Sequence, residues 1–396
     1  MHFLTLNSGS SSIKFSLYRI GLKEELMSMG SVEGIGFAAS FFHVKDGSGK
    51  TVITKNLGLS DHVAALKEIT AWLDKASTDG PIDAVGHRLV HGGSAYTEPR
   101  LITLEVLSAL DELIPFAPDH LPHEIEAVRE IARLYPGIRQ VACFDTAFHR
   151  TMPGVARLYA LPEEVRQHGV ERYGFHGLSY EYILNELRKE SGQETADGRV
   201  IIAHLGNGAS MAAFSRGRSR DTTMGFTPAG GLVMSTRSGD LDPGVIVYLL
   251  KEKGMDAANL NKMVNKQSGL IGVSGTSPNM KELLDREAKD RRAADAVQLF
   301  CYQAKKFLGA LATVLGGLDT LIFTGGIGEN SPTIRDRICR EMGFFGISVD
   351  ANRNNTNAGV ISCDSGQVVV RVMKTNEELM IARHTYQLIT KAGRKT

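Results

Sequence analysis

Two distant segments of this 396-residue chain repeat one pattern: a short apolar strand, a turn rich in Gly, Ser and Asn, and a second apolar strand. The first segment, Phe3–Tyr18, reads F-L-T-L-N-S-G-S-S-S-I-K-F-S-L-Y, and the second, Val200–Phe214, reads V-I-I-A-H-L-G-N-G-A-S-M-A-A-F. When Gly9 is aligned with Gly208, both turns end in Ser one or two residues later. The repeat predicts two related halves with a boundary near residue 150, each with one β-hairpin tip rich in backbone N–H groups.

The rest of the chain alternates apolar strands with amphipathic helical segments, which predicts a mixed α/β fold. Besides the two hairpins, strands are expected at Ile82–Val90, Val141–Phe144 and Leu321–Phe323. Helices are expected at Ser60–Lys75, Thr103–Ile114, Pro122–Leu134, Ser179–Lys189, Pro243–Lys253, Lys281–Leu315 with a break allowed inside it, Ser331–Met342 and from Thr375 towards Thr390. The stretch 31–60 is expected to form loops and hairpins.

Charge and cysteine usage exclude several classes of protein. Lys plus Arg number 45 and Asp plus Glu 44, which argues against a generally basic nucleic-acid binder and against an acidic disordered tail. The four Cys form no C-x-x-C motif, so a disulfide scaffold or zinc ribbon is not expected and a reducing compartment is. The N-terminus lacks a signal-peptide pattern, and the least charged run, Val200–Ser215, is too short to span a bilayer. We therefore expect a cytoplasmic protein with neither nucleic acid nor membrane as partner.

Three glycine-rich turns each follow an apolar strand. They are N-S-G-S-S-S-I-K at 7–14, H-L-G-N-G at 204–208 and T-G-G-I-G-E-N at 324–330. Gly lets backbone amides approach an anion closely, while Ser hydroxyls and Lys14 add donors and charge, so the first turn is suited to phosphate. An ordinary hairpin turn is the alternative for any one of them. Two such turns could hold a polyphosphate from both sides, and ligands of α/β proteins bind at the carboxyl ends of strands.

Two arginines lie among glycines. Arg88 lies in G-H-R-L-V-H-G-G at the end of a strand, and Arg237 lies in M-S-T-R-S-G-D-L-D-P-G. A guanidinium in such a loop is suited to binding a carboxylate or phosphate through two N–H groups. A surface ion pair of Arg237 with Asp240 or Asp242 is the alternative.

Asp145 and His176 are the other candidates for chemistry. Asp145 directly follows the apolar strand Val141–Phe144, where a carboxylate is costly unless it is paired or binds a metal; a helix N-cap is the alternative. His176, in Y-G-F-H-G, is either structural or close to a ligand. The twelve His show no H-E-x-x-H motif or clustered ligand spacing, which argues against zinc.

The segment Thr375–Glu378, T-N-E-E, opens the last expected helix. Thr375 and Glu378 match the S/T-x-x-E capping box, which gives Glu378 a structural role. Glu377 is not needed for that box, so it is the better candidate for a functional carboxylate such as a magnesium ligand.

Together these motifs resemble those of the acetate kinases, the acetokinase family within the actin-like and sugar-kinase-like ATPase superfamily. N-S-G-S-S-S-I-K at 7–14 is similar to the first family signature, and D-T-T-M-G-F-T-P-A-G-G-L-V-M-S-T-R-S-G-D-L-D-P at 221–243 is similar to the second. H-R-L-V-H-G-G, F-D-T-A-F-H, R-Y-G-F-H-G, H-L-G-N-G, G-G-I-G-E-N and T-N-E-E-L-M-I-A-R also match in family order, across essentially the whole chain.

The resemblance implies an α/β protein with two similar domains of the actin-like ATPase (ribonuclease H-like) type and a cleft between them. The N-terminal domain is expected at 1–147 plus 380–396, and the C-terminal domain, with the dimer interface of a homodimer, at 148–379. The implied reaction is direct, reversible transfer of a phosphoryl group from ATP to acetate, giving acetyl phosphate and ADP, as part of acetyl-CoA biosynthesis. Magnesium is the implied cofactor, with Mn²⁺ as an alternative ion.

The resemblance also assigns roles to individual residues. Magnesium is expected at Asn7 and Glu377. Residues expected to bind ATP are Ser10, Ser12, Lys14, His204, Leu205, Gly206, Asn207, Gly208, Asn279, Met280, Lys281, Gly326, Ile327, Gly328, Glu329 and Asn330. The catalytic set is expected to be Asp145, Arg88, Arg237 and His176, and the acetate site Arg88, Val90, Phe175 and Pro228.

This chain departs from the family pattern at a few positions. It has Asp119 and Leu121 where many members read Leu and Asn, and Gly230 and Ser235 where Glu and Gly are usual. At 279–281 it reads N-M-K where D-F-R is frequent. A propionate or other short-chain acyl kinase is the nearest alternative function. A non-catalytic actin-like nucleotide switch is a remote one, because a switch needs no arginines for an acceptor.

Overall fold

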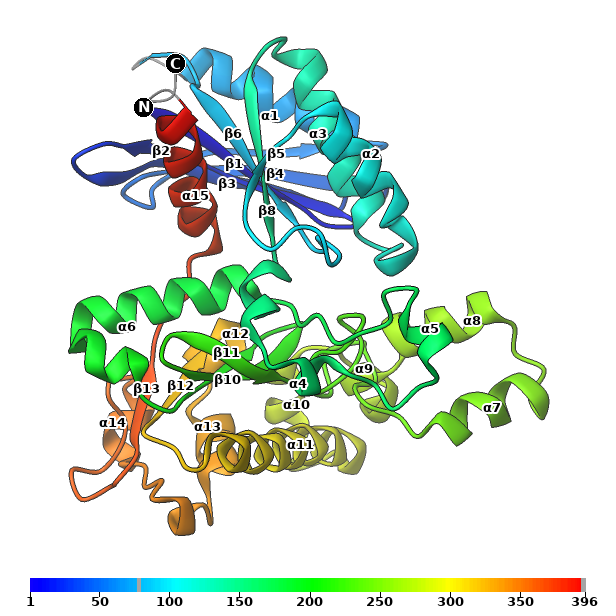
Figure 1. Ribbon diagram of the computed structural model, residues 1–396, viewed down its shortest axis with the longest axis vertical. Helices are drawn as coiled ribbons and strands as arrows, with labels where there is room; N and C mark the ends of the chain where they lie inside the picture. Colours follow the sequence, from blue (N-terminus) through cyan, green and yellow to red (C-terminus); the bar gives the residue numbers. More distant parts are fainter. Residues whose placement is uncertain (77–79, 393–396) are drawn as a thin grey trace. The chain divides into compact units, whose positions relative to one another are not determined.

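The computed structural model describes residues 1–76 and 80–392 (Figure 1). The chain divides by its contacts into two compact units, Met1–Phe148 with Asn376–Thr396, and His149–Thr375. The sequence had placed this division at 147 and 380. We refer to them as unit 1 and unit 2 and describe each by itself.

Unit 1 is built on an eight-stranded sheet with the order β5-β4-β3-β2-β1-β6-β8-β7. Strands β1 and β2 form the first hairpin, and β1, β6 and β8 run parallel to one another. The strands are β1 (His2–Ser8), β2 (Ser12–Ile20), β3 (Glu24–Glu33), β4 (Ser40–Asp46), β5 (Thr51–Leu57), β6 (Ala84–Leu89), β7 (Arg100–Leu101) and β8 (Arg139–Phe144).

Helices cover both faces of this sheet, which explains why five of the seven residues of β1 are buried. Leu4 and Leu6 pack with Leu66 and other apolar residues under α1 and α3, whereas Phe3, which points to the other face, contacts Tyr386 of α15. The helices of unit 1 are α1 (His62–Ala76), α2 (Leu104–Glu112), η1 (Ile114–Phe116), α3 (Leu121–Leu134) and α15 (Glu377–Ala392).

Unit 2 is built on a five-stranded sheet with the order β11-β10-β9-β12-β13. The strands are β9 (Val200–Leu205), β10 (Ala209–Ser215), β11 (Arg218–Thr222), β12 (Thr320–Thr324) and β13 (Val369–Val372). The helices and helical turns from the end of unit 1 onward are η2 (Ala147–Thr151), α4 (Gly154–Arg157), α5 (Glu163–Arg166), α6 (Gly177–Asp197), α7 (Pro243–Lys251), α8 (Ala257–Lys262), η3 (Met263–Gln267), α9 (Gly269–Ser274), α10 (Met280–Arg286), α11 (Arg291–Leu315), α12 (Gly325–Asn330), α13 (Pro332–Cys339), η4 (Gly343–Phe345) and α14 (Ala351–Asn355).

The two sheets share one topology, which confirms the repeat seen in the sequence. In unit 1 the order β3-β2-β1-β6-β8 has two antiparallel pairs followed by two parallel pairs. In unit 2 the order β11-β10-β9-β12-β13 has the same sequence of pairings. Each unit therefore carries its glycine-rich hairpin at the corresponding place in its sheet.

The stretch 31–60 forms hairpins as expected, because β3, β4 and β5 pair antiparallel in chain order. Two other local expectations need correction. The segment 324–330 is not a turn, because Gly325–Asn330 forms the short helix α12 directly after β12. The last helix begins at Glu377 rather than at Thr375.

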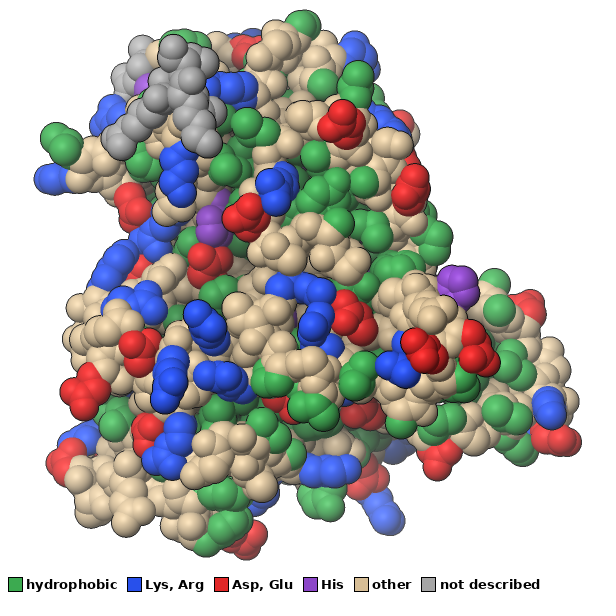
Figure 2. All heavy atoms as spheres, viewed as in Figure 1, with side chains coloured by type: hydrophobic (Ala, Val, Ile, Leu, Met, Phe, Trp, Pro, Cys, Tyr) green, Lys and Arg blue, Asp and Glu red, His purple; other side chains and the backbone are tan. Residues whose placement is uncertain are grey.

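No helix in the described ranges is long and apolar enough to cross a membrane. Side chains of both charge signs occupy the face shown in Figure 2, in keeping with the formal net charge of +1.

Candidate active site

Three neighbouring parallel strands of unit 1 bring three candidate residues together. Asn7 lies near the end of β1, Arg88 near the end of β6, and Asp145 directly after β8. Arg88 donates from Nε to Asp145 Oδ1 at 3.1 Å, from Nη2 to Asp145 Oδ2, and from Nη1 to Asn7 Oδ1 at 3.1 Å. Asp145 is fully buried, and its charge is compensated by Arg88, whose guanidinium is bound by both of its oxygens.

Glu377, the first residue of α15, joins this group. Its Oε2 lies 3.7 Å from Arg88 Nε, and its side chain is mostly buried. The capping box predicted for this helix is wrong. Asn376 is the residue whose side-chain oxygen accepts the N–H of Leu379, at 2.9 Å, while the Thr375 hydroxyl hydrogen-bonds with Ser179. Glu377 is thus near Arg88, but the capping box was not a sound reason to single it out.

The charged residues of this group shift one another's pKa values. Burial raises the pKa of Glu377 to about 7, with Asp145 adding to the shift and Arg88 opposing it. Burial by itself lowers the pKa of Arg88, but Asp145 and Glu377 outweigh it and the net shift is upward. Arg88 therefore stays a cation, and positive charge near Glu377 favours the ionised form of that carboxyl group.

Glu124 is a buried carboxylate of this region that the sequence analysis missed. Its Oε2 accepts the backbone N–H of Val90 at 2.9 Å, and only 2% of the residue is exposed. Burial raises its pKa to about 8, opposed by the Val90 N–H and by Arg88. A signal was present: on α3, Glu124 falls among the apolar residues Leu121, Ile125 and Val128 on the buried face.

The first glycine turn joins β1 to β2 as expected. It is closed by a hydrogen bond from the Gly9 N–H to the Ser12 carbonyl, 2.7 Å. Ser10 and Lys14 are exposed, and Ser12 is half-buried. The positive charge of Lys14 opposes the upward shift in the pKa of Glu377, so this lysine interacts electrostatically with the carboxylates of the group.

In unit 2, His176 and the second glycine turn lie together. His176 has a left-handed backbone, φ 59°, directly before α6. Its Nδ1 hydrogen-bonds with Ser210 at 2.9 Å, and its ring stacks on that of His204, with centroids 4.3 Å apart. A Cβ on Gly208 would lie 3.3 Å from His176 Nε2 and 3.7 Å from Arg237 Nη1. Because Gly208 has no side chain, space stays open beside His176 Nε2 and Arg237 Nη1.

The loop with Arg237 is fastened to the same turn. The Ser235 N–H donates to the Asn207 carbonyl at 3.1 Å, and the Ser235 hydroxyl donates to Asn207 Oδ1 at 3.2 Å. Arg237 Nη1 donates to the Pro228 carbonyl at 3.3 Å. Ser235, one of the departures from the family pattern, thus orients the turn through its side chain.

Asp240 and Asp242, the alternative partners of Arg237, bind backbone amides. Asp240 accepts the N–H of Gly231 at 2.7 Å, and Asp242 caps α7 by accepting the N–H of Gly244 at 2.6 Å. Both carboxylates therefore have a structural role, because they bind backbone N–H groups of the loop and of α7.

Several residues that are expected to bind the nucleoside part of the nucleotide also have structural roles. Glu329 Oε1 accepts the N–H groups of Gly325 at 2.9 Å and Thr375 at 3.2 Å. Asn279 caps α10 by accepting the N–H of Lys281 at 2.9 Å. Leu205 and Met280 are buried in the core, so their side chains pack inside the unit rather than facing a nucleotide.

The last residues of the predicted set, Gly326, Ile327, Gly328 and Asn330, lie on α12. A Cβ on Gly206 would lie 3.9 Å from the Gly326 nitrogen, so the second glycine turn and the start of α12 are adjacent.

The residues expected to form an acyl pocket lie in both units. Val90 belongs to unit 1, and Phe175 and Pro228 belong to unit 2; all three are buried. In unit 2, His149 Nε2 donates to the Phe175 carbonyl at 2.9 Å, while Ser219 binds its Nδ1 at 2.9 Å. Burial lowers the pKa of His149 to about 4, so a neutral imidazole fixes the backbone of Phe175.

Magnesium, which the resemblance implies, fits the oxygen atoms of unit 1. Mg²⁺ prefers carboxylate and amide oxygens, and Asn7, Asp145 and Glu377 supply them around Arg88. Burial, the main cause of the raised pKa of Glu377, disfavours its ionised form, and a bound cation would favour that form again.

Comparison with known proteins identifies the family to which this chain belongs. A family model described as the acetokinase family matches residues 2–383. The chain is 45% identical over 391 residues to an acetate kinase of Rhodopseudomonas palustris, covering 97% of this chain and 98% of that one. Its structure resembles Porphyromonas gingivalis acetate kinase, with TM-score 0.89, 41% identity and coverage of 98% and 99%. It also resembles a propionate kinase from Francisella tularensis, with TM-score 0.91, 36% identity and coverage of 97% and 98%. With this similarity over nearly its whole length, and with the two-domain actin-like fold of those structures, the chain belongs to the acetokinase family.

Proposed function

We propose that this protein transfers a phosphoryl group from Mg-ATP to acetate, reversibly, giving acetyl phosphate and ADP. The observation that carries this proposal is the ion pair of Arg88 with the fully buried Asp145 at the ends of parallel strands. An arginine has five N–H donors, and the bonds to Asp145 and Asn7 use three of them. A guanidinium held in this way is preorganised for an anionic acceptor, which a nucleotide switch would not need.

The chemistry needs an oriented acceptor rather than a base. A carboxylic acid such as acetic acid titrates near ~4–5, so the acceptor is already ionised at neutral pH. One acetate oxygen forms the new bond to the γ-phosphorus while the bond to the ADP oxygen breaks, and the departing electron pair stays on ADP. Asp145 has both oxygens bound by Arg88, so we assign it to positioning Arg88 and not to proton transfer. Positioning and charge stabilisation account for most phosphoryl-transfer catalysis.

His176 is suited to donate a hydrogen bond to the transferring phosphoryl group. The Tyr180 hydroxyl contacts the Ser210 hydroxyl, which in turn contacts His176 Nδ1. If Tyr180 donates to Ser210 and Ser210 donates to His176, the imidazole proton is on Nε2, beside Gly208 and Arg237. Arg237 and the His176 Nε2–H then provide positive charge and a donor for the equatorial oxygens.

Asn7 and Glu377, with Asp145 beside them, would hold magnesium directly or through water. When bound, the ion neutralises charge on the terminal phosphates of ATP. The residues of the chain then orient the two reactants, and the glycine turns supply backbone N–H groups to the phosphates.

Propionate is the second candidate acceptor, favoured by the similarity to the Francisella propionate kinase. We expect acetate to be preferred, propionate to be accepted, and butyrate to be used at least tenfold less efficiently, because a poorly fitting methylene costs about 1–3 kcal/mol. Trapping the acyl phosphates as hydroxamates with each acid at saturating Mg-ATP gives the three kcat/KM values. Butyrate equal to or better than acetate would refute the acetate assignment but leave acyl-kinase chemistry in place.

A further inference from the structure

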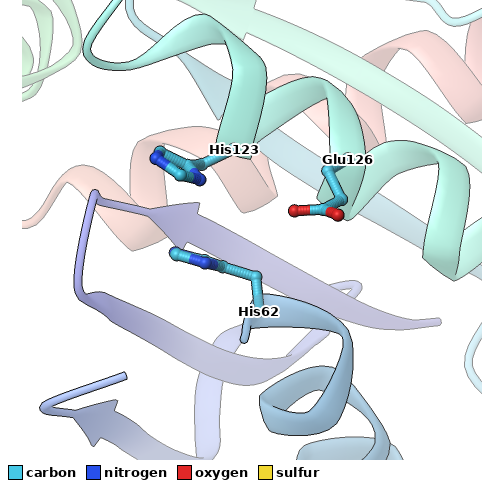
Figure 3. A group of neighbouring side chains, drawn as sticks. All are labelled: His62, His123 and Glu126. Atoms are coloured by element: carbon cyan, nitrogen blue, oxygen red, sulfur yellow. The ribbon is translucent and has the colours of Figure 1, made fainter. Parts of the chain in front are cut away.

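Beside the first glycine turn, three side chains with metal-binding atoms converge between two helices of unit 1 (Figure 3). His62 is the first residue of α1, and His123 and Glu126 lie three residues apart on α3, which puts them on one side of that helix. One ligand atom from each of the three lies within 4.8 Å of the others. His62 is buried, His123 half-buried and Glu126 exposed.

His62 is oriented as a metal-binding histidine commonly is. Its Nε2 lies 2.6 Å from the carbonyl oxygen of Gly9. A carbonyl oxygen can only accept, so Nε2 carries a proton and donates it. In the neutral ring the lone pair is then on Nδ1. Histidines that bind metals usually donate their other ring N–H to a carbonyl or carboxylate, which fixes the tautomer and the ring orientation. The Gly9 carbonyl provides this support before any ion binds.

We propose that His62, His123 and Glu126 bind a borderline divalent transition-metal ion such as Zn²⁺, with water completing its coordination. Two imidazoles and a carboxylate form a zinc-type donor set, whereas Mg²⁺ prefers oxygen ligands. This site is therefore chemically distinct from the magnesium site expected around Asn7 and Glu377. Zinc was not expected from the sequence because the His residues show no H-E-x-x-H motif or clustered ligand spacing. His62 is remote in sequence from the other two residues, so no local spacing reveals this set.

Binding requires one side chain to move. The rings of His62 and His123 are stacked, with centroids 4.5 Å apart and planes 18° apart, and the lone pairs of nearly parallel rings do not meet at one point. His62 is fixed by Gly9, so His123 must turn about its side-chain bonds. Its partial exposure leaves room for this, and exposed Glu126 can follow the ion.

The test uses the full-length protein with excess Mg²⁺ present to occupy the oxygen-rich site. Co²⁺ serves as a spectroscopic probe of nitrogen ligation, and Zn²⁺ affinity is measured by competition with a chromophoric chelator. We expect a visible Co²⁺ absorption that Zn²⁺ abolishes. In His123→Asn and Glu126→Gln, the Zn²⁺ affinity should fall at least about 10-fold. Removing a residue that only orients a metal ligand already lowers metal affinity by about this factor, and removing a ligand itself should cost no less. His168→Asn, which alters an exposed histidine of unit 2, is the matched control and should bind as the wild type does.

Two further readouts separate binding from structural damage. Without added metal, both variants should keep the wild-type Tm and acetate-dependent turnover, because neither residue belongs to the candidate active site. Zn²⁺ should raise the Tm of the wild type but not of the variants, since a ligand of the folded state stabilises it. Equal Zn²⁺ affinity in wild type and both variants, or a wild-type Co²⁺ spectrum without an absorption that Zn²⁺ abolishes, would overturn the proposal.

Discussion

Arg88 is the residue on which the proposed chemistry depends most, and Arg237 is its counterpart in unit 2. Arg88→Ala or Arg237→Ala should lower kcat by roughly 10²-fold or more, as the loss of a preorganised donor does. The double variant should lose less than the product of the two single losses, because the proposed function has both groups act on one transition state. Steady-state kinetics with circular dichroism as a folding control measures this. Turnover near that of the wild type in either single variant would contradict the assigned roles.

Glu377 and Glu378 are adjacent residues for which different effects are expected. Glu377 lies against Arg88, with its pKa raised to about 7 mainly by burial. Glu377→Gln removes a charged magnesium ligand, so the Mg²⁺ concentration for half-maximal activity should rise or activity should disappear. Glu378→Gln should have a smaller effect, because Glu378 is not an expected ligand and the helix cap is Asn376. A magnesium titration at saturating ATP and acetate ranks the two, and the reverse ranking would mean that the ligand is misassigned.

Glu124 should make stability depend on pH in a definite direction. Its folded-state pKa of about 8 lies above the ordinary value of 4.5, so the folded state binds the extra proton between these values. Its contribution to the free energy of unfolding therefore falls as pH rises from about 4.5 to 8. Glu124→Gln keeps an oxygen to accept the Val90 N–H and removes the buried charge, so the variant should gain stability relative to wild type at pH 8 but not at pH 5. Denaturation curves at the two pH values test this; a difference that does not change with pH would exclude it.

Part of the candidate site could be predicted from the local sequence alone. Arg88, Asp145 and Arg237 could be selected because a charged side chain among glycines or after a buried strand has few structural uses. Glu124 was missed because it lies inside a helix without any motif, and its importance comes from tertiary burial beside Val90 and Arg88.

Among the elements, the two hairpins were predicted well because their information is local: an apolar strand, a turn that needs glycine, and a second strand. The break in Lys281–Leu315 was also anticipated, and α10 ends at Arg286 before α11 begins at Arg291. Helix α12 was predicted as a turn because its glycine-rich sequence has low helix propensity. Packing against β9 overrides that preference: a Cβ on Gly325 would lie 2.8 Å from the Leu205 carbonyl oxygen.

The start of α15 provides a test at this scale. Asn376 Oδ1 accepts the Leu379 N–H at 2.9 Å and the Tyr18 hydroxyl at 3.2 Å. Asn376→Ala should reduce the stability of unit 1 by about 0.5–2 kcal/mol, the usual cost of losing an N-cap, while Asn376→Asp should keep most of it. Trp72 is the sole Trp of the chain and packs in the core of unit 1, so its fluorescence follows this unit during urea denaturation. An alanine variant as stable as wild type would show that the cap contributes nothing.

At the scale of the whole molecule, the chain is a repeated α/β unit in which each copy carries one glycine-rich hairpin and one candidate arginine. The sequence could predict the repeat because strand and turn patterns recur. It could not show that Asn7, Arg88 and Asp145 converge in unit 1, because that depends on parallel pairing of β1, β6 and β8, which are far apart in the sequence. Arg88 and Asp145 were candidates from their local sequence and Asn7 came from the family resemblance, and the hydrogen bonds now give a physical reason for grouping them.

The most direct test of the proposed function measures ADP and acyl phosphate together, in one reaction with Mg-ATP, with and without acetate. The proposed function predicts that ADP formation requires acetate and that each ADP is matched by one acetyl phosphate, trapped as the hydroxamate. Chelation of the divalent cation or Arg88→Ala should suppress both products equally. ADP formation at the same rate without acetate, or without matching acetyl phosphate, would contradict phosphoryl transfer to a carboxylate.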